Sequence, residues 1–258
     1  MFSVIRRWWH NRIITRSDLS DAAWQQAFSQ LPLLQRLTLS EAEQLREIVI
    51  LFLYKKSFTG AQGLRLNDEM KLIVALQACL PILNLGIEWY QGWVSIIVYP
   101  DSFVPETNVT DEGGIVHRRR SVLSGESWLR GPVILSWRGV ATAGELDGSN
   151  LVIHEFVHKL DMLNGVANGF PPLHKHMHKE AWAADFSQAF DDFQHRVNKG
   201  KSAVIDDYAA TSPAEFFAVL SEVFFERPEQ LMAAYPALYR HLADFYRQDP
   251  GLILVKTS

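Results

Sequence analysis

The chain has 258 residues, of which 48% are hydrophobic and 21% are charged, and its formal net charge is -4. This composition is typical of a globular protein with a large core, and the acidic balance excludes a global basic field that would attract nucleic acid or an anionic membrane. The single cysteine, Cys79, excludes an intramolecular disulfide and is expected to be a buried, inert thiol.

The first residues are basic. Residues 1–16 contain four arginines and no acid, but they lack the continuous apolar run of a secretory signal. We interpret 1–20 as a mobile basic tail, with a membrane-surface or partner-binding segment as the alternative. The longest uncharged run, 72–87, is interrupted by Pro81 and is too short to span a bilayer. We therefore expect a cytoplasmic protein without a membrane partner, with one domain over 21–258.

The stretch from 21 to 85 has helical periodicity. Residues Ser40 to Glu43 have the form of a capping box ahead of an apolar run at 45–54. The segment 67–80 repeats this logic, and Pro81 ends it. The sequence therefore predicts an N-terminal helical layer.

The pattern then changes to strands. The segment 94–99 is rich in β-branched residues, and 132–140 is bounded by glycines. These runs predict a small mixed sheet formed mainly between residues 91 and 140. We expect the strand near 133–137 to be the edge that pairs with an extended peptide.

Beyond Ala141 the helical periodicity returns. Helices are predicted at 149–164, 179–197, 213–225 and 228–248. The fold class that follows is α+β, with an N-terminal helical layer, a small mixed sheet and a helical C-terminal half.

The first of these helices contains the pattern H-E-x-x-H. At about 3.6 residues per turn, His154 and His158 lie on one face, where two imidazoles can bind the same ion. Glu155 is rotated by about 100° from His154 and flanks the open coordination position. Zinc lowers the pKa of a bound water towards about 7, so Glu155 can act as general base in peptide hydrolysis. The alternative is a pair of partly exposed histidines beside a solvated glutamate.

A catalytic zinc site usually has a third protein ligand. Asp161 lies on the face of His158, but a role as a hydrogen-bond acceptor or at the start of a loop is favoured. The helix predicted at 213–225 is apolar nearly all round, and Glu215 and Glu222 lie on one of its faces. Glu215 is the candidate ligand and Glu222 the acceptor for an imidazole N–H. However, Ser212-Pro-Ala-Glu215 also has the form of a capping box, and these residues alone do not decide between the two roles.

Four segments carry a resemblance to a known family. They are His154-Glu-Phe-Val-His-Lys-Leu-Asp161, Asp207-Tyr-Ala-Ala-Thr-Ser-Pro-Ala-Glu-Phe-Phe-Ala-Val-Leu-Ser-Glu222, Gly114-Ile-Val-His117 and Gly131-Pro-Val-Ile-Leu. With them, residues 21–250 resemble the Mlc titration factor A family of bacterial zinc metallopeptidases. The resemblance implies a zincin-like metallopeptidase domain that binds one Zn2+ per chain.

The resemblance also implies roles for individual residues. Zinc would be held by His154, His158 and Glu215, and Glu155 would be catalytic. Tyr208 would lie near the site, where its phenol can donate to an oxyanion; the alternative is a packing residue at the start of a helix.

One further histidine is implied near the metal. His117 would be able to reach the ion, either swinging away during catalysis or marking a latent form, because a fourth protein ligand displaces the reactive water. The alternative is a solvated loop histidine beside three arginines.

The implied function has two parts. Family members are aminopeptidase-like on short peptides, and they bind a glucose-responsive transcriptional repressor that controls sugar uptake. This sequence lacks the Gly-x-Met-Glu-Asn element by which many zinc aminopeptidases bind the substrate amine. The alternative is a non-catalytic module that uses zinc structurally and sequesters the repressor. Direct DNA binding through Arg118 to Arg120 is disfavoured, because an acidic loop lies beside them.

Overall fold

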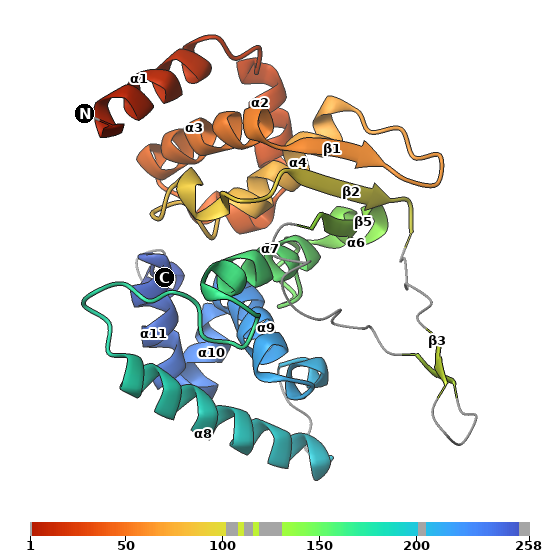
Figure 1. Cartoon of the computed structure of the whole chain (residues 1–258), viewed down its shortest axis with the longest axis vertical. Helices are drawn as coiled ribbons and strands as arrows, with labels where there is room; N and C mark the ends of the chain where they lie inside the picture. Colours follow the sequence, from red (N-terminus) through yellow and green to blue (C-terminus); the bar gives the residue numbers. More distant parts are fainter. Residues whose placement is uncertain (1, 102–107, 111–115, 119–130, 201–204, 253–258) are drawn as a thin grey trace.

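The N-terminal layer is helical, as predicted (Figure 1). The computed structural model describes residues 2–101, 108–110, 116–118, 131–200 and 205–252. The helices of this layer are α1 (Phe2–Thr15), α2 (Asp21–Ser29), the 3-10 helix η1 (Pro32–Arg36), α3 (Leu39–Lys55) and α4 (Asp68–Cys79). Helix α4 packs against both α2 and α3.

Side-chain caps set where α3 and α4 begin. The Thr38 hydroxyl accepts from the Glu41 N–H and the Glu41 carboxylate accepts from the Thr38 N–H, so the capping box forms two residues earlier than predicted. Asn67 caps α4 by accepting from the Met70 N–H, at the predicted start. Cys79 ends α4 and is fully buried, and burial raises the pKa of its thiol well above the usual value.

The main sheet is parallel, which corrects the prediction of a mixed sheet. Its strand order is β1 (Ser57–Gly60), β2 (Ser95–Tyr99) and β5 (Val133–Ser136). Helix α4 connects β1 to β2, as a crossover between parallel strands requires. Strand β1 lies outside the predicted range of 91–140, because four residues that end in a glycine give little periodicity.

An antiparallel pair, β3 (Asn108–Thr110) and β4 (Val116–Arg118), forms a separate sheet. In the main sheet β5 is an edge strand, at the position predicted for it. The strand predicted over 132–140 ends early, because the Ser136 hydroxyl accepts from the Gly139 N–H and caps α6 (Trp137–Thr142).

The C-terminal half is helical, as predicted, and the fold is α+β. Its helices are α7 (Leu151–Asp161), η3 (Met162–Asn164), α8 (Lys179–Asn198), η4 (Asp207–Ala210), α9 (Pro213–Glu226), α10 (Pro228–Ala234) and α11 (Pro236–Tyr246). Helix α9 contacts α7, α8, α10 and α11. The single helix predicted over 228–248 is two helices, because Pro236 has no N–H to continue the first and opens the second.

Residues 1–20 differ from the predicted tail. Residues Phe2–Thr15 form α1, which packs against α3. Ile13 and Ile14 contact the core, and the Arg6 guanidinium lies 3.5 Å from the Glu88 carboxylate of the 3-10 helix η2 (Ile87–Tyr90). Apolar and charged contacts therefore hold this helix against the protein, whereas the basic composition of the segment alone predicted a tail.

One cluster of buried apolar side chains runs through all these layers, from Trp24 in α2 to Tyr246 in α11. Phe156 of α7 lies within it, with its ring centroid 5.6 Å from that of Phe52 and 5.3 Å from that of Tyr90. The inner face of α7 is thus fixed in the core, which directs its histidines towards α9. Among the described residues, no helix is long and apolar enough to cross a bilayer.

Candidate metal centre

Helix α7 presents the two histidines. Its N-cap is Asn150, whose side-chain oxygen accepts from the Ile153 N–H at 2.9 Å. His154 and His158 follow one turn apart on one face, with ring centroids 4.8 Å apart. Their Nε2 atoms are separated by 3.2 Å, so both imidazoles point to the same position.

Helix α9 brings Glu215 to that point. The Ser212 hydroxyl accepts from the Glu215 N–H at 3.2 Å and caps the helix. The Glu215 carboxylate does not return to the cap: its Oε2 lies 3.0 Å from His154 Nε2 and 3.4 Å from His158 Nε2. Only half of a capping box forms, and the glutamate side chain faces the two imidazoles instead.

These three side chains fit a metal ion. Around a tetrahedral zinc with bonds of about 2.0–2.1 Å, ligand atoms are separated by roughly 3.3 Å. The three observed separations are 3.0, 3.2 and 3.4 Å. Glu215 Oε2 is buried, and no donor among the described residues is aligned to it. Two imidazole nitrogens and a carboxylate oxygen are a ligand set that zinc prefers, so His154, His158 and Glu215 can bind one ion.

Glu222 orients the first of these ligands. Its Oε1 lies 2.7 Å from His154 Nδ1, and its Oε2 accepts from the Asn150 N–H. A carboxylate at Nδ1 favours the proton there and leaves the Nε2 lone pair for a metal. This is the acceptor role that the sequence indicated.

The electrostatics of the centre favour a positive charge between the three side chains. Burial lowers the pKa of His154, but the carboxylates of Glu215 and Glu222 outweigh it and raise that pKa to about 10. Burial raises the pKa of Glu215, yet the contacts with His154 and His158 hold it well below its usual range. The arrangement of charges thus agrees with the ligand chemistry.

Glu155 and Tyr208 lie beside the three ligands. Glu155 follows His154 in α7 and is half-buried, and within the described ranges its carboxylate has no hydrogen-bond or ion-pair partner. Tyr208 lies in η4, and its ring centroid is 6.1 Å from that of His154. His117 belongs to β4 and pairs with Val109, and its side chain lies outside the described part of the structure.

Comparison with known proteins agrees with this centre. The model of a family described as glucose-regulated metallo-peptidase M90 matches residues 5–247. This chain belongs to the M90 family. It is 42% identical over 248 residues to Mlc titration factor A of Salmonella typhimurium (strain LT2), covering 94% of this chain and 91% of that protein. It is 39% identical over 244 residues to Mlc titration factor A of Klebsiella pneumoniae, covering 94% and 92%.

These matches confirm the resemblance that the sequence motifs indicated. A metallopeptidase family implies a metal ion, and in this M90 chain His154, His158 and Glu215 are able to hold it. The centre is therefore that of a metallopeptidase family member.

Two acids support the centre from further away. Asp161, one turn after His158, is fully buried and accepts from the Gly169 N–H at 2.7 Å, so it orders the loop after α7. Glu226 accepts from the Gly144 and Gly148 N–H groups and from the Asn150 side chain. Glu226 was not predicted from the sequence, although its position four residues after Glu222 places it on the same face of α9.

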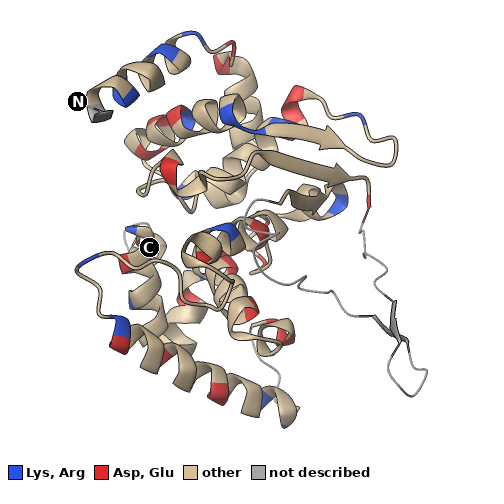
Figure 2. Cartoon of the chain, viewed as in Figure 1, with Lys and Arg blue, Asp and Glu red and all other residues tan. Residues whose placement is uncertain are grey.

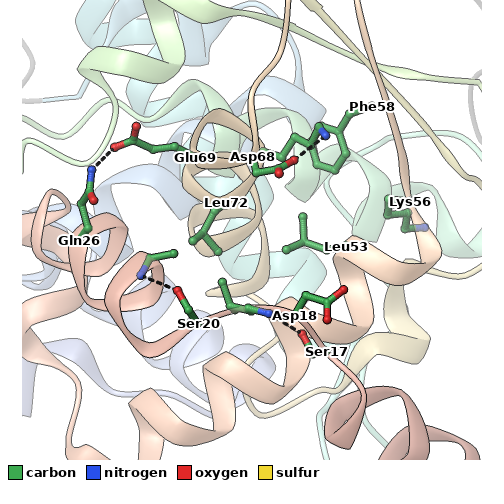
Figure 3. Close-up of a pocket in the computed structure, with 13 residues that line it drawn as sticks. Ser17, Asp18, Ser20, Gln26, Leu53, Lys56, Phe58, Asp68, Glu69 and Leu72 are labelled. Carbon is green, nitrogen blue, oxygen red and sulfur yellow. Dashed lines mark hydrogen bonds and ion pairs between the residues drawn. The ribbon is translucent and has the colours of Figure 1, made fainter.

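A cavity of about 550 Å³ lies elsewhere, in the N-terminal layer (Figure 3). Most of its polar side chains already have partners: Gln26 donates to Glu69 at 2.9 Å, and Lys71 pairs with Asp68 at 2.9 Å. Lys56 donates to two backbone carbonyls. No residue of the metal centre lines this cavity, and we assign it no ligand.

Proposed function

We propose that this M90 chain is a zinc-dependent, aminopeptidase-like hydrolase of short peptides, in a zincin-like domain over 21–258 that acts in the cytoplasm. The observation that carries the proposal is the approach of His154 Nε2, His158 Nε2 and Glu215 Oε2 to within 3.0–3.4 Å of one another. Zinc bound there would supply a Lewis acid that polarises a peptide carbonyl and acidifies a water molecule.

The chain's own side chains would move the protons. Glu155 is half-buried, adjacent to a ligand and without a hydrogen-bond or ion-pair partner among the described residues, which suits a base that takes a proton and returns it to the leaving amine. The Tyr208 phenol, whose ring centroid lies 6.1 Å from that of His154, would donate a hydrogen bond to the oxygen on which negative charge develops.

An extended substrate has a place to bind. Strand β5 is the sheet edge that precedes α6 and α7 in the chain, and it contacts α7. A peptide that adds to this edge would run beside the helix that carries His154 and His158, with its backbone hydrogen-bonded to β5.

The test combines metal analysis with a peptidase assay on two variants. Glu155→Gln keeps the size of the side chain and should retain about one zinc per chain while losing roughly 10²–10⁴-fold or more in turnover. Glu215→Ala should lose the metal itself. Full activity of Glu155→Gln would refute the assigned base, and full zinc content of Glu215→Ala would refute the third ligand.

A second function is favoured by the name of the relatives, Mlc titration factor A. We propose that this chain binds a glucose-responsive transcriptional repressor and so modulates sugar-uptake genes. Repressor binding should survive Glu155→Gln, because a docking surface and a cleft can coexist on one fold. If the wild type bound the repressor but hydrolysed no aminoacyl substrate, the chain would be a non-catalytic zinc module.

A further inference from the structure

Helix α1 carries large apolar side chains that neither the core nor the metal centre uses. Val4, Ile5, Trp8 and Trp9 are 70%, 52%, 54% and 50% exposed. At about 100° per residue these four positions occupy one arc of about 140°. His10, Ile13 and Ile14 lie on the opposite side, where the helix packs against the protein. Helix α1 therefore has two apolar faces, one that packs against the protein and one that is exposed.

The charges around this face have one sign. Residues 1–16 contain Arg6, Arg7, Arg12 and Arg16 and no acid, in a chain whose net charge is -4. Figure 2 shows basic and no acidic positions on α1. Arg6 faces Glu88, whereas the Arg12 guanidinium lies 5.5 Å from the Trp8 ring centroid, on the exposed face. Trp8 and Arg12 thus share this outward surface.

We propose that α1 is an interfacial helix that docks the protein on an anionic lipid bilayer. The indoles of Trp8 and Trp9 would lie at the depth of the headgroups, Val4 and Ile5 would reach the acyl boundary, and the arginines would contact lipid phosphates. The whole-chain charge, on which the expectation of no membrane partner rests, does not describe this face. The proposal is independent of the peptidase activity.

The position of α1 allows this contact. It is the outermost element of the N-terminal layer, and α3 lies beneath it (Figure 1). A flat surface can approach the exposed arc without passing the C-terminal helices that carry the metal ligands. A single short helix with a few anchors gives reversible attachment, so binding should depend on lipid charge and on salt.

The experiment is sedimentation of the full chain with vesicles of phosphatidylcholine, with and without phosphatidylglycerol. The wild type should bind only the anionic vesicles and should dissociate as salt is raised. Trp8→Ser/Trp9→Ser should lose binding, and Arg12→Ala should bind about fivefold more weakly. Thermal unfolding of each variant checks that the fold is intact.

The matched control removes exposed apolar side chains elsewhere. Leu39 and Val94 are 87% and 54% exposed, and Leu39→Ser/Val94→Ser should bind anionic vesicles as the wild type does. Failure of the wild type to bind anionic vesicles would overturn the proposal, as would an equal loss in the control. So would a Trp8-dependent dimer without vesicle binding, because it would assign this face to a second copy of the chain.

Discussion

At the level of single residues, two glutamates on α9 contact the two ring nitrogens of His154 and hold its imidazole in place. Glu215 faces its Nε2 and Glu222 its Nδ1, at 3.0 and 2.7 Å. The ring is thus restrained from both sides, and Glu222 is itself restrained by the Asn150 N–H. A ligand whose tautomer and orientation are fixed in advance loses less entropy when it binds a metal.

Replacing Glu222 should therefore weaken metal binding without removing a ligand. We expect Glu222→Gln to lower zinc affinity by about 10- to 100-fold, because an amide is a weaker acceptor for the imidazole N–H. Competition with a chromogenic chelator measures this. Glu180→Gln, at an exposed position in α8, is the control, and equal affinities for the two variants would contradict the assigned role.

Between elements, the loop after α7 lies against the first turn of α9. The Gly169 N–H donates to Asp161, and its carbonyl accepts from the Trp182 indole at 3.1 Å. Its φ is +77°, and a Cβ built there would lie 2.5 Å from the carbonyl oxygen of Pro213. Pro213 is two residues before Glu215, so this close approach affects the position of the candidate third ligand.

Gly169→Ala tests the contact. The left-handed φ costs about 1–2 kcal/mol for any alanine, and the clash with Pro213 adds to it. The control is Gly200→Ala, with φ +63° and nothing within 4 Å of the added Cβ. Urea unfolding should show a larger loss of stability for Gly169→Ala than for Gly200→Ala. Of the two variants, only Gly169→Ala should bind zinc more weakly than the wild type. Equal losses of stability would show that α9 accommodates the methyl group.

Elements whose signals are local were predictable from sequence. Helix α4 starts directly after its cap, Asn67, because a cap acts within a few residues. Helix α8 has no side-chain cap but begins at the predicted residue, Lys179, because its apolar periodicity is also local. Strand β1 and helix α6 were not predicted, since four and six residues carry too little pattern. Helix α1 was missed because what fixes it, such as the contact with Glu88, is distant in sequence.

In the metal centre too, only the part with a local sequence signal was predictable. His154 and His158 are one turn apart, so their convergence follows from helix geometry. Glu215 was ambiguous because Ser212 caps α9 in either case, and only the packing of α9 on α7 settles where its carboxylate lies. Long-range pairing of this kind leaves no mark in a local sequence pattern.

At the scale of the whole molecule, a buried polar network joins the layers. The Asn150 amide donates to Gln77 of α4 at 2.9 Å and to Glu226 of α9 at 3.1 Å. The Arg36 guanidinium of η1 donates to the last carbonyls of α9, near the negative end of its dipole. Gln77 and Asn150 are 73 residues apart, and Glu226 is 76 beyond Asn150, so the sequence did not reveal the network.

This network should make stability depend on pH. Burial raises the pKa of Glu226 to about 7, against hydrogen bonds from Asn150, Gly148 and Gly144 that lower it. Because the folded-state pKa exceeds the usual glutamate pKa of 4.5, the protonated carboxyl stabilises the fold fully below about pH 4.5. That stabilisation is lost as pH rises through about 7, and it amounts to roughly 3 kcal/mol at most.

Glu226→Gln removes this titration and leaves a neutral side chain of the same size. The variant loses one acceptor for the glycine N–H groups, which lowers its stability by a constant amount. Across the window from about pH 4.5 to about pH 7, however, the wild type should lose stability relative to the variant. Urea unfolding in the presence of a chelator measures the difference without the titration of metal-bound ligands. The exposed Glu180→Gln should show no such trend, and a pH-independent difference for Glu226→Gln would mean that Glu226 stays ionised throughout the window.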